Sequence, residues 1–107
     1  MPYVVYILKC SDGSYYTGSA ADLLRRLWEH ETGALSSAYT YSRRPVKLVW
    51  NSEEVKRYSD ALRFERQIKG WSRAKKEALI RGDYEAVHEV VKRERKQKEQ
   101  NNKTTSR

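Results

Sequence analysis

The sequence has 107 residues, of which 38% are hydrophobic and 34% are charged, so it predicts one domain with a modest core and a large polar surface. Its formal charge of +8 favours an anionic partner, with nucleic acid first and a membrane surface second. Cys10 is the only cysteine, which excludes an intramolecular disulfide and a cysteine-based zinc site, and we expect no disulfide-linked partner.

No apolar run approaches the ~20 residues that span a bilayer. The apolar stretch YVVYIL near the start is also too short for the core of a signal peptide. We therefore expect a cytoplasmic protein without a membrane partner, and a monomer by default.

A hairpin opens the chain. Residues 3–10 are rich in β-branched and aromatic types and predict a strand, and residues 14–18 predict the returning strand. A two-residue loop, Asp12-Gly13, would place Tyr16 on the face away from Tyr6. A three-residue loop from Ser11 to Gly13, with Gly13 left-handed, would place Tyr16 opposite Leu8 and Gly18 opposite Tyr6.

The three-residue loop is the one that brings Tyr6 and Tyr16 to the same face of the sheet. The glycine at position 18 would then leave room above the Tyr6 ring for a ligand to approach the backbone. We predict this loop if the two phenols act together. Ordinary aromatic packing of the hairpin tyrosines is the alternative.

The first helix is predicted from a capping box, Ser19 to Asp22, as far as Gly33. Its expected buried face consists of Leu23, Leu24, Leu27 and Trp28. Asp22, Arg26 and His30 follow one another at intervals of four residues along another side. A guanidinium one turn from an imidazole suits phosphate oxygens, whereas the alternative is a solvated stripe of ion pairs worth ~0.2–0.5 kcal/mol each.

The rest of the chain predicts a loop over residues 34–45, a strand over 46–50 and three helices. The helices begin at Ser59-Asp60, Ser72 and Asp83, and the first two end near Lys69 and Gly82. From Lys92 onwards there is no apolar residue, which predicts a basic disordered tail. The order β-β-α-β-α-α with a C-terminal helix indicates an α+β fold, a three-stranded antiparallel sheet flanked by helices. We expect a domain over residues 1–82, followed by an amphipathic helix and tail over 83–107.

Glu65 lies at the margin of the apolar stripe that Ala61, Phe64 and Ile68 form on the second helix. A carboxylate there is costly unless it is paired or binds a cation. Lys69, one turn later, is the ordinary partner. The sharper interpretation is a ligand for a hard cation such as Mg²⁺, which often takes one or two protein carboxylates.

Basic and aromatic residues gather in two further places. Residues 63–81 contain seven Lys and Arg residues but only two Glu residues, and this excess of positive charge predicts an edge that contacts phosphates. The loop AYTYSRRP mixes tyrosine with arginine, which suits backbone phosphates and stacked bases.

The order of these residues resembles the GIY-YIG endonuclease superfamily. The resemblance rests on Val4-Val5-Tyr6, Tyr16-Thr17-Gly18, Arg26 with His30, and Glu65 in FERQIK, and it covers about residues 2–80. YVVYILKCSDGSYYTGSAADLLRRLWEH and YTYSRRPVKLVW are especially similar to the small stand-alone UPF0213 group. The signature triplets read VVY and YTG, and nothing after KKEALIRG supplies the additional DNA-binding domain of larger members.

The resemblance implies a metal-dependent endonuclease that acts on DNA. Its implied catalytic residues are Tyr6, Tyr16, Arg26, His30 and Glu65. Glu65 would hold one Mg²⁺ or Mn²⁺ ion, Arg26 would offset charge on the phosphate, and either Tyr6 or Tyr16 would deprotonate the attacking water. The expected nucleic-acid contacts are Lys9, Gly18, Ser19, Tyr39, Thr40, Ser42, Arg43, Lys69, Arg73, Lys75 and Lys76.

Because few side chains remain to read bases, we expect the activity to be directed by the structure of the substrate rather than by its sequence. The alternative is a nucleic-acid-binding module with this fold and little or no turnover. The four residues Tyr6, Tyr16, Arg26 and Glu65 favour the enzyme.

Overall fold

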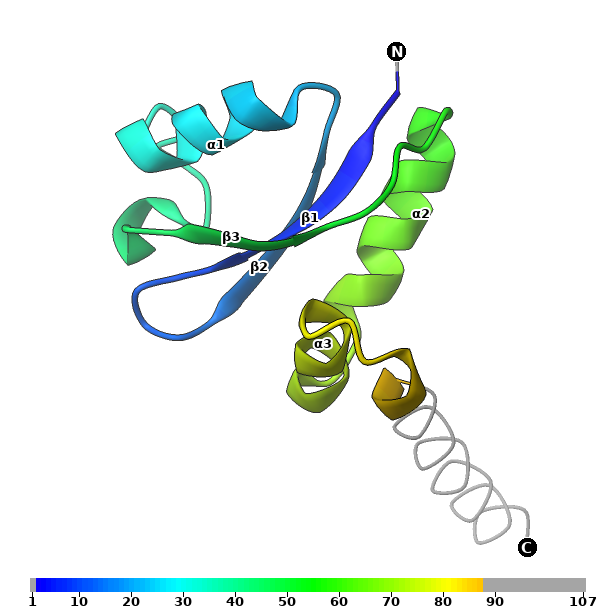
Figure 1. Cartoon of the computed structure of the whole chain (residues 1–107). Helices are drawn as coiled ribbons and strands as arrows, with labels where there is room; N and C mark the ends of the chain where they lie inside the picture. Colours follow the sequence, from blue (N-terminus) through cyan, green and yellow to red (C-terminus); the bar gives the residue numbers. More distant parts are fainter. Residues whose placement is uncertain (1, 88–107) are drawn as a thin grey trace, which may run out of the picture. The chain divides into compact units, whose positions relative to one another are not determined.

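A computed structural model describes residues 2–87 of the chain. The elements are β1 (Val4–Lys9), β2 (Tyr15–Ala20), α1 (Leu23–Thr32), a 3₁₀ turn (Tyr41–Arg43), β3 (Lys47–Asn51), α2 (Tyr58–Lys69) and α3 (Arg73–Ile80). The strands form one antiparallel sheet in the order β2-β1-β3, with β1 in the centre (Figure 1). The predicted α+β fold is confirmed.

The hairpin between β1 and β2 uses the three-residue loop. Tyr16 lies opposite Leu8, and Tyr6 lies opposite Gly18. The backbone N–H of Cys10 donates to the carbonyl of Ser14 (2.8 Å), and Gly13 has a φ of 84°, which glycine adopts without strain. The prediction that Tyr6 and Tyr16 share a face of the sheet is therefore confirmed.

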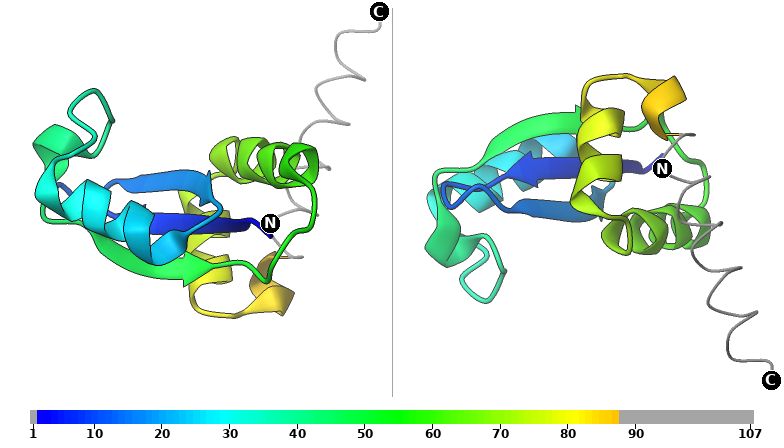
Figure 2. Two further views of the ribbon diagram at one scale, coloured as in Figure 1. Left: turned by 90° about the horizontal axis from the view of Figure 1, so that it is seen from above. Right: turned by 90° about the horizontal axis from the view of Figure 1, so that it is seen from below.

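The two faces of the sheet carry different helices. Leu23 and Leu27 of α1 pack on the face that contains Tyr6 and Leu8. Helix α2 packs on β1 and β2, and its Phe64 meets Trp50 of β3 edge to face, with ring centres 6.2 Å apart. Figures 1 and 2 show α1 and α2 on either side of the strands. Residues of β1 are buried from both sides because each face has its own helix.

The start of α1 differs from the prediction. Ser19 belongs to β2, and Asp22 is the residue that caps the helix, with its side chain accepting from the N–H of Arg25 at 3.1 Å. The capping box that was expected to begin at Ser19 is wrong, because Ser19 pairs with Val5 in the sheet. Gly33 ends the helix, as predicted.

Two residues of the expected buried face of α1 are exposed. Leu24 is 81% exposed and Trp28 is 61% exposed, whereas Leu23 and Leu27 are half-buried against the core. Helix α1 therefore covers this face of the sheet with a narrow stripe that consists of Leu23 and Leu27. Leu24 and Trp28 line a surface pocket of about 360 Å³ with residues of β3.

Residue contacts divide the described residues into two compact units, the first ending at Gly70 and the second beginning at Trp71. In the second unit Ser72 caps α3 as predicted, and its hydroxyl accepts from the N–H of Lys75 at 3.3 Å. Asp83 caps the next helical turn by accepting from the N–H of Ala86 at 3.0 Å. The domain boundary after residue 82 stays a prediction.

The remainder of the predicted C-terminal helix and the predicted disordered tail lie outside the described residues. Within residues 2–87, no helix combines the length and apolar character that crossing a membrane requires.

Candidate active site

Three buried side chains from separate parts of the fold form one hydrogen-bonded chain. The hydroxyl of Tyr6 on β1 lies 2.9 Å from Nε2 of His30 on α1. Nδ1 of the same imidazole lies 2.6 Å from the hydroxyl of Thr40, in the loop before β3. Tyr6 and Thr40 are fully buried and His30 is 1% exposed, so each side chain depends on the others for its partners.

This chain corrects two sequence predictions. His30 was expected to present its imidazole to phosphate oxygens beside Arg26, but both of its ring nitrogens are engaged inside the protein. Thr40 was expected to contact nucleic acid, but no part of it reaches the surface. Thr40 orients His30, and His30 in turn orients the Tyr6 hydroxyl.

Burial keeps both ends of the Tyr6–His30 pair neutral. It raises the pKa of the Tyr6 phenol above its ordinary value, and the neighbouring Tyr16 adds to this rise, while Arg26 acts more weakly in the opposite direction. Burial also lowers the pKa of His30, and the positive charge of Arg26 lowers it further. A neutral phenol and a neutral imidazole therefore face each other at neutral pH.

Tyr16 lies beside this pair and is only half-buried. Its ring stacks on that of Tyr39 at 6.3 Å and 15°, and meets the His30 ring at 5.3 Å in an edge contact. The ammonium of Lys69 on α2 lies 6.0 Å from the centre of the Tyr16 ring. Of the two phenols on this face, Tyr16 is the one that a substrate can reach.

Gly18 is required by the Tyr6 hydroxyl and not by an incoming ligand. A Cβ atom at position 18 would lie 2.6 Å from the Tyr6 hydroxyl oxygen and 3.1 Å from Cε1 of Tyr16. The expected space for a ligand above the ring is thus filled by the phenol itself. Gly18 is buried, so the prediction that it contacts nucleic acid is wrong.

Arg26 and Glu65 meet at Ser19, at the outer strand of the sheet. Nη1 of Arg26 donates to the Ser19 carbonyl (3.3 Å), and the Ser19 hydroxyl donates to Oε1 of Glu65 (2.9 Å). Oε2 of Glu65 lies 3.1 Å from the ammonium of Lys69, and Nε of Arg26 lies 3.6 Å from Oε1 of Glu29. Arg26, Glu65 and Ser19 line a pocket of about 380 Å³ together with Tyr3, Ala20, Ala21, Tyr58 and Leu62.

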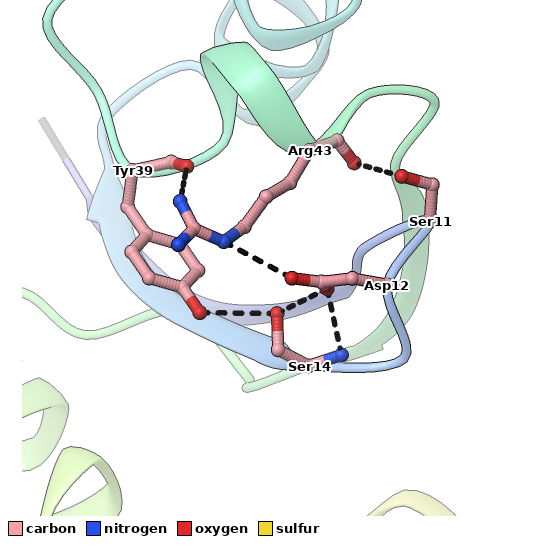
Figure 3. A network of polar contacts seen from close by, with 5 residues as sticks. All are labelled: Ser11, Asp12, Ser14, Tyr39 and Arg43. Carbon is pink, nitrogen blue, oxygen red and sulfur yellow. Dashed lines mark hydrogen bonds and ion pairs between the residues drawn. The ribbon is translucent and has the colours of Figure 1, made fainter.

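A second network holds the Tyr39 loop to the hairpin turn (Figure 3). Nε of Arg43 donates to Oδ2 of Asp12 (3.1 Å) and Nη1 donates to the Tyr39 carbonyl (2.8 Å). The Tyr39 hydroxyl donates to the Ser14 hydroxyl, which donates to Oδ1 of Asp12. Hydrogen bonds from Ser14, aided by the charge of Arg43, lower the pKa of Asp12. The network fixes Tyr39 against Tyr16.

The structure therefore places the predicted site residues in three groups. The first unit brings together Tyr6, Tyr16, Ser19, Arg26, His30, Tyr39, Arg43, Glu65 and Lys69 through the contacts above. Lys9 and Ser42 are exposed on that unit. Arg73, Lys75 and Lys76 belong to the second unit, where Lys75 is buried with its ammonium 4.1 Å above the Trp71 ring.

Sequence reasoning missed three residues that the structure puts around the site. Asp12 was read only as a turn residue, although an acidic residue in a turn is a natural partner for the arginines of the loop. Tyr3 and Tyr58 line the pocket of Arg26 and Glu65. No sequence pattern joins these two tyrosines, which are brought together by the bridge between Tyr3 and Val55.

Comparison with known proteins gives the family of the chain. Residues 2–78 match the family described as the GIY-YIG catalytic domain. A UPF0213 protein of Syntrophus aciditrophicus is 49% identical over 83 residues, which cover 78% of this chain and 94% of the relative. A UPF0213 protein of Halobacterium salinarum is 48% identical over 76 residues, covering 71% of this chain and 96% of the relative.

A solution structure of a UPF0213 protein from Bacillus halodurans is 39% identical, with a TM-score of 0.48, and covers 80% of this chain and 93% of that one. The family match extends from β1 into α3 and includes Tyr6, Tyr16, Arg26 and Glu65. The chain belongs to the GIY-YIG catalytic domain family and, within it, to the UPF0213 group.

Proposed function

We propose that the protein is a metal-dependent endonuclease that hydrolyses phosphodiester bonds in DNA, directed by the structure of the substrate. The observation that carries this proposal is that Arg26 of α1 and Glu65 of α2 line one pocket, while Lys69, the ion-pair partner of Glu65, lies 6.0 Å from the ring of Tyr16 on β2. Family membership supports a nuclease-type activity for this arrangement.

Arg26 is suited to the scissile phosphate. Its side chain is 37% exposed, Nη1 donates to the Ser19 carbonyl, and Nε lies at ion-pair distance from Glu29 (3.6 Å) without a hydrogen-bond partner. A guanidinium carries five N–H donors, so others remain for phosphate oxygens. A fixed positive charge at this position stabilises the negative charge that builds up on the phosphate in the transition state.

The two phenols have different roles in this proposal. Tyr16 is the phenol that orients the attacking water and takes its proton, because its ring is reachable and the ammonium of Lys69 lies nearby. The water oxygen forms the new bond to phosphorus, and the bond to the leaving 3′-oxygen breaks. Tyr6 is buried and held by His30, which suits it to positioning the neighbouring Tyr16 ring.

Glu65 is the residue that would hold the cation. Its carboxylate is 12% exposed on the pocket wall, and a carboxylate is the ligand type that Mg²⁺ and Mn²⁺ prefer. Among residues 2–87 there is no group of three or more His, Cys, Asp or Glu side chains that could enclose a metal. This fits a cation held by one carboxylate, waters and substrate phosphate. A bound cation would neutralise the phosphate and stabilise the leaving oxygen.

A binding module with little turnover is the second candidate. Lys69 already pairs with Glu65 at 3.1 Å, which is what an ordinary ion pair between residues four apart on a helix looks like. If the only role of Glu65 is its ion pair with Lys69, the pocket binds a phosphate through Arg26 and the phosphodiester bond is not cleaved.

The deciding experiment compares Glu65→Ala with Arg26→Ala on labelled branched, single-stranded and duplex DNA in Mg²⁺ or Mn²⁺. We expect Glu65→Ala to abolish cleavage and to bind DNA as well as or better than the wild type, since a negative charge leaves a phosphate site. Arg26→Ala should abolish cleavage and weaken binding, because a phosphate donor is lost.

Glu77→Ala is the matched control, because Glu77 forms the same type of ion pair with Arg73 on α3 and the change in net charge is identical. This variant should cleave normally. A Glu65→Ala protein that cuts DNA at the wild-type rate would remove the carboxylate from the mechanism and favour the binding module.

A further inference from the structure

We propose that the pocket beside Arg26 and Glu65 binds an unpaired nucleobase of the nucleotide next to the scissile phosphate. This inference rests on the proposed function, because it assigns the phosphate to Arg26. Tyr58 is the stacking surface, and Tyr3 and Leu62 complete the apolar wall.

The pocket has two walls of different chemistry. Arg26, Glu65 and Ser19 form a polar wall, which suits a phosphate and its counter-ion. Tyr3, Tyr58 and Leu62 lie on the apolar side. A nucleotide combines an anionic phosphate with a flat aromatic base, so its two parts match the two walls. The volume of about 380 Å³ lies within the range of small-ligand sites.

The apolar wall is held in place by backbone pairing. The N–H of Tyr3 donates to the Val55 carbonyl (2.8 Å), and the N–H of Val55 donates back to Tyr3 (2.7 Å). This bridge brings the start of β1 to the start of α2, where the rings of Tyr3 and Tyr58 meet at 5.4 Å and 63°. Leu62 follows Tyr58 by four residues and so lies on the same side of α2.

Tyr58 has a ring surface available for stacking. It is 56% exposed, although large aromatic residues usually bury most of their surface. Its contact with Tyr3 is an edge contact, which covers at most one face of each ring. Tyr39, which the sequence predicted to contact nucleic acid, is already stacked on Tyr16 and covered by the Arg43 guanidinium at 3.7 Å.

A pocket for an unpaired base favours one class of substrate. A base inside a duplex is paired and stacked on both sides, and taking it out requires breaking those contacts. A base in a single strand, a flap or a frayed end enters the pocket at a much smaller cost. The preferred substrate is therefore DNA with an unpaired nucleotide next to the phosphate that is cut.

The test is a binding experiment that does not depend on cleavage. The full-length protein is titrated, in the presence of EDTA, into a single-stranded oligonucleotide that carries one 2-aminopurine, whose fluorescence falls when the base stacks on an aromatic ring. Moving the 2-aminopurine along the strand locates the position that is quenched. We expect quenching with wild type and with Tyr58→Phe, which keeps the ring.

Tyr58→Ala should lose the quenching and should bind the strand about 5-fold to 150-fold more weakly, the range found for loss of one base–aromatic stack. Tyr84→Ala is the matched control, because Tyr84 is an exposed tyrosine (66%) of the second unit. The control should quench and bind like the wild type. An abasic nucleotide at the quenched position should weaken wild-type binding by a similar factor and leave Tyr58→Ala binding unchanged.

Two outcomes separate this inference from the proposed function. Quenching that depends on Tyr58 in a protein that never cuts DNA would support the base site and overturn the nuclease. Cleavage of DNA with equal efficiency by wild type and Tyr58→Ala, without Tyr58-dependent quenching, would overturn the base site and leave the nuclease standing.

Discussion

Replacing Tyr6 by Phe removes a single oxygen atom from the centre of the site, and its effect on stability can be worked out from the contacts. The lost hydroxyl leaves Nε2 of His30 without its partner at 2.9 Å, inside a region that water does not reach. An unsatisfied buried polar group costs about 1–3 kcal/mol. We expect the free energy of unfolding to fall by that amount, and the melting temperature by about 4–8 °C per kcal/mol.

Urea denaturation of wild type and Tyr6→Phe measures this change directly. Tyr41→Phe is the control, because Tyr41 is exposed and removal of an exposed hydroxyl should change stability by less than about 0.5 kcal/mol. A double-mutant cycle with His30→Leu isolates the Tyr6–His30 pair. The bond from His30 to Thr40 is absent from both proteins that lack the imidazole, so its loss cancels from the cycle.

The cycle should return a coupling energy of about 0.5–3 kcal/mol, with the double variant less destabilised than the sum of the single ones. Additive effects, or a Tyr6→Phe protein as stable as the control, would refute the buried Tyr6–His30 bond.

Cleavage assays give a second comparison of the two phenols. Tyr16→Phe should abolish cleavage, whereas Tyr6→Phe should only lower the rate of cleavage, since Tyr6 positions the reactive ring.

Two further predictions follow from the same contacts. Gly18→Ala should destabilise the protein by about 1–3 kcal/mol and reduce cleavage, because the new Cβ would displace the Tyr6 hydroxyl, whereas DNA binding should stay intact. Denaturation curves measure the stability, cleavage assays the activity and binding titrations the affinity. For His30, whose pKa burial lowers below its ordinary 6.5, stability should fall as pH drops through 6.5 towards the folded-state pKa, because the unfolded chain takes up the proton first. Denaturation curves at several pH values should show this component in wild type, and it should be absent from His30→Gln.

The strands and most helix ends could be predicted from the sequence because their signals are local. For the turn, the local signal allowed two loops, and the three-residue loop that the structure has was predicted from the expectation that Tyr6 and Tyr16 act together on one face. Ser72 was predicted as a cap from its position before an amphipathic stretch, and its hydroxyl accepts from the helix as expected.

The burial of individual side chains could not be predicted in the same way. The periodicity of α1 gives a wide apolar face, and only the packing of the helix on the sheet shows that Leu23 and Leu27 are covered and Leu24 is not. His30 shares a helix side with Arg26 in the sequence pattern. It is buried because the loop that carries Thr40 folds over it, and that loop has no periodic signal.

Burial also separates the functions of the two tyrosines. Both phenols lie on one face of the sheet, with ring centres 6.3 Å apart, so the hairpin register alone makes them equivalent. The Thr40–His30 chain closes over Tyr6, and burial then raises the pKa of its phenol, which keeps Tyr6 protonated and therefore unavailable as a base. Tyr16 is flanked by Tyr39 and Lys69 and stays within reach of a substrate. The loop from residue 34 to 45 therefore contributes to both roles, since Thr40 fixes the buried phenol through His30 and Tyr39 supports the reachable one.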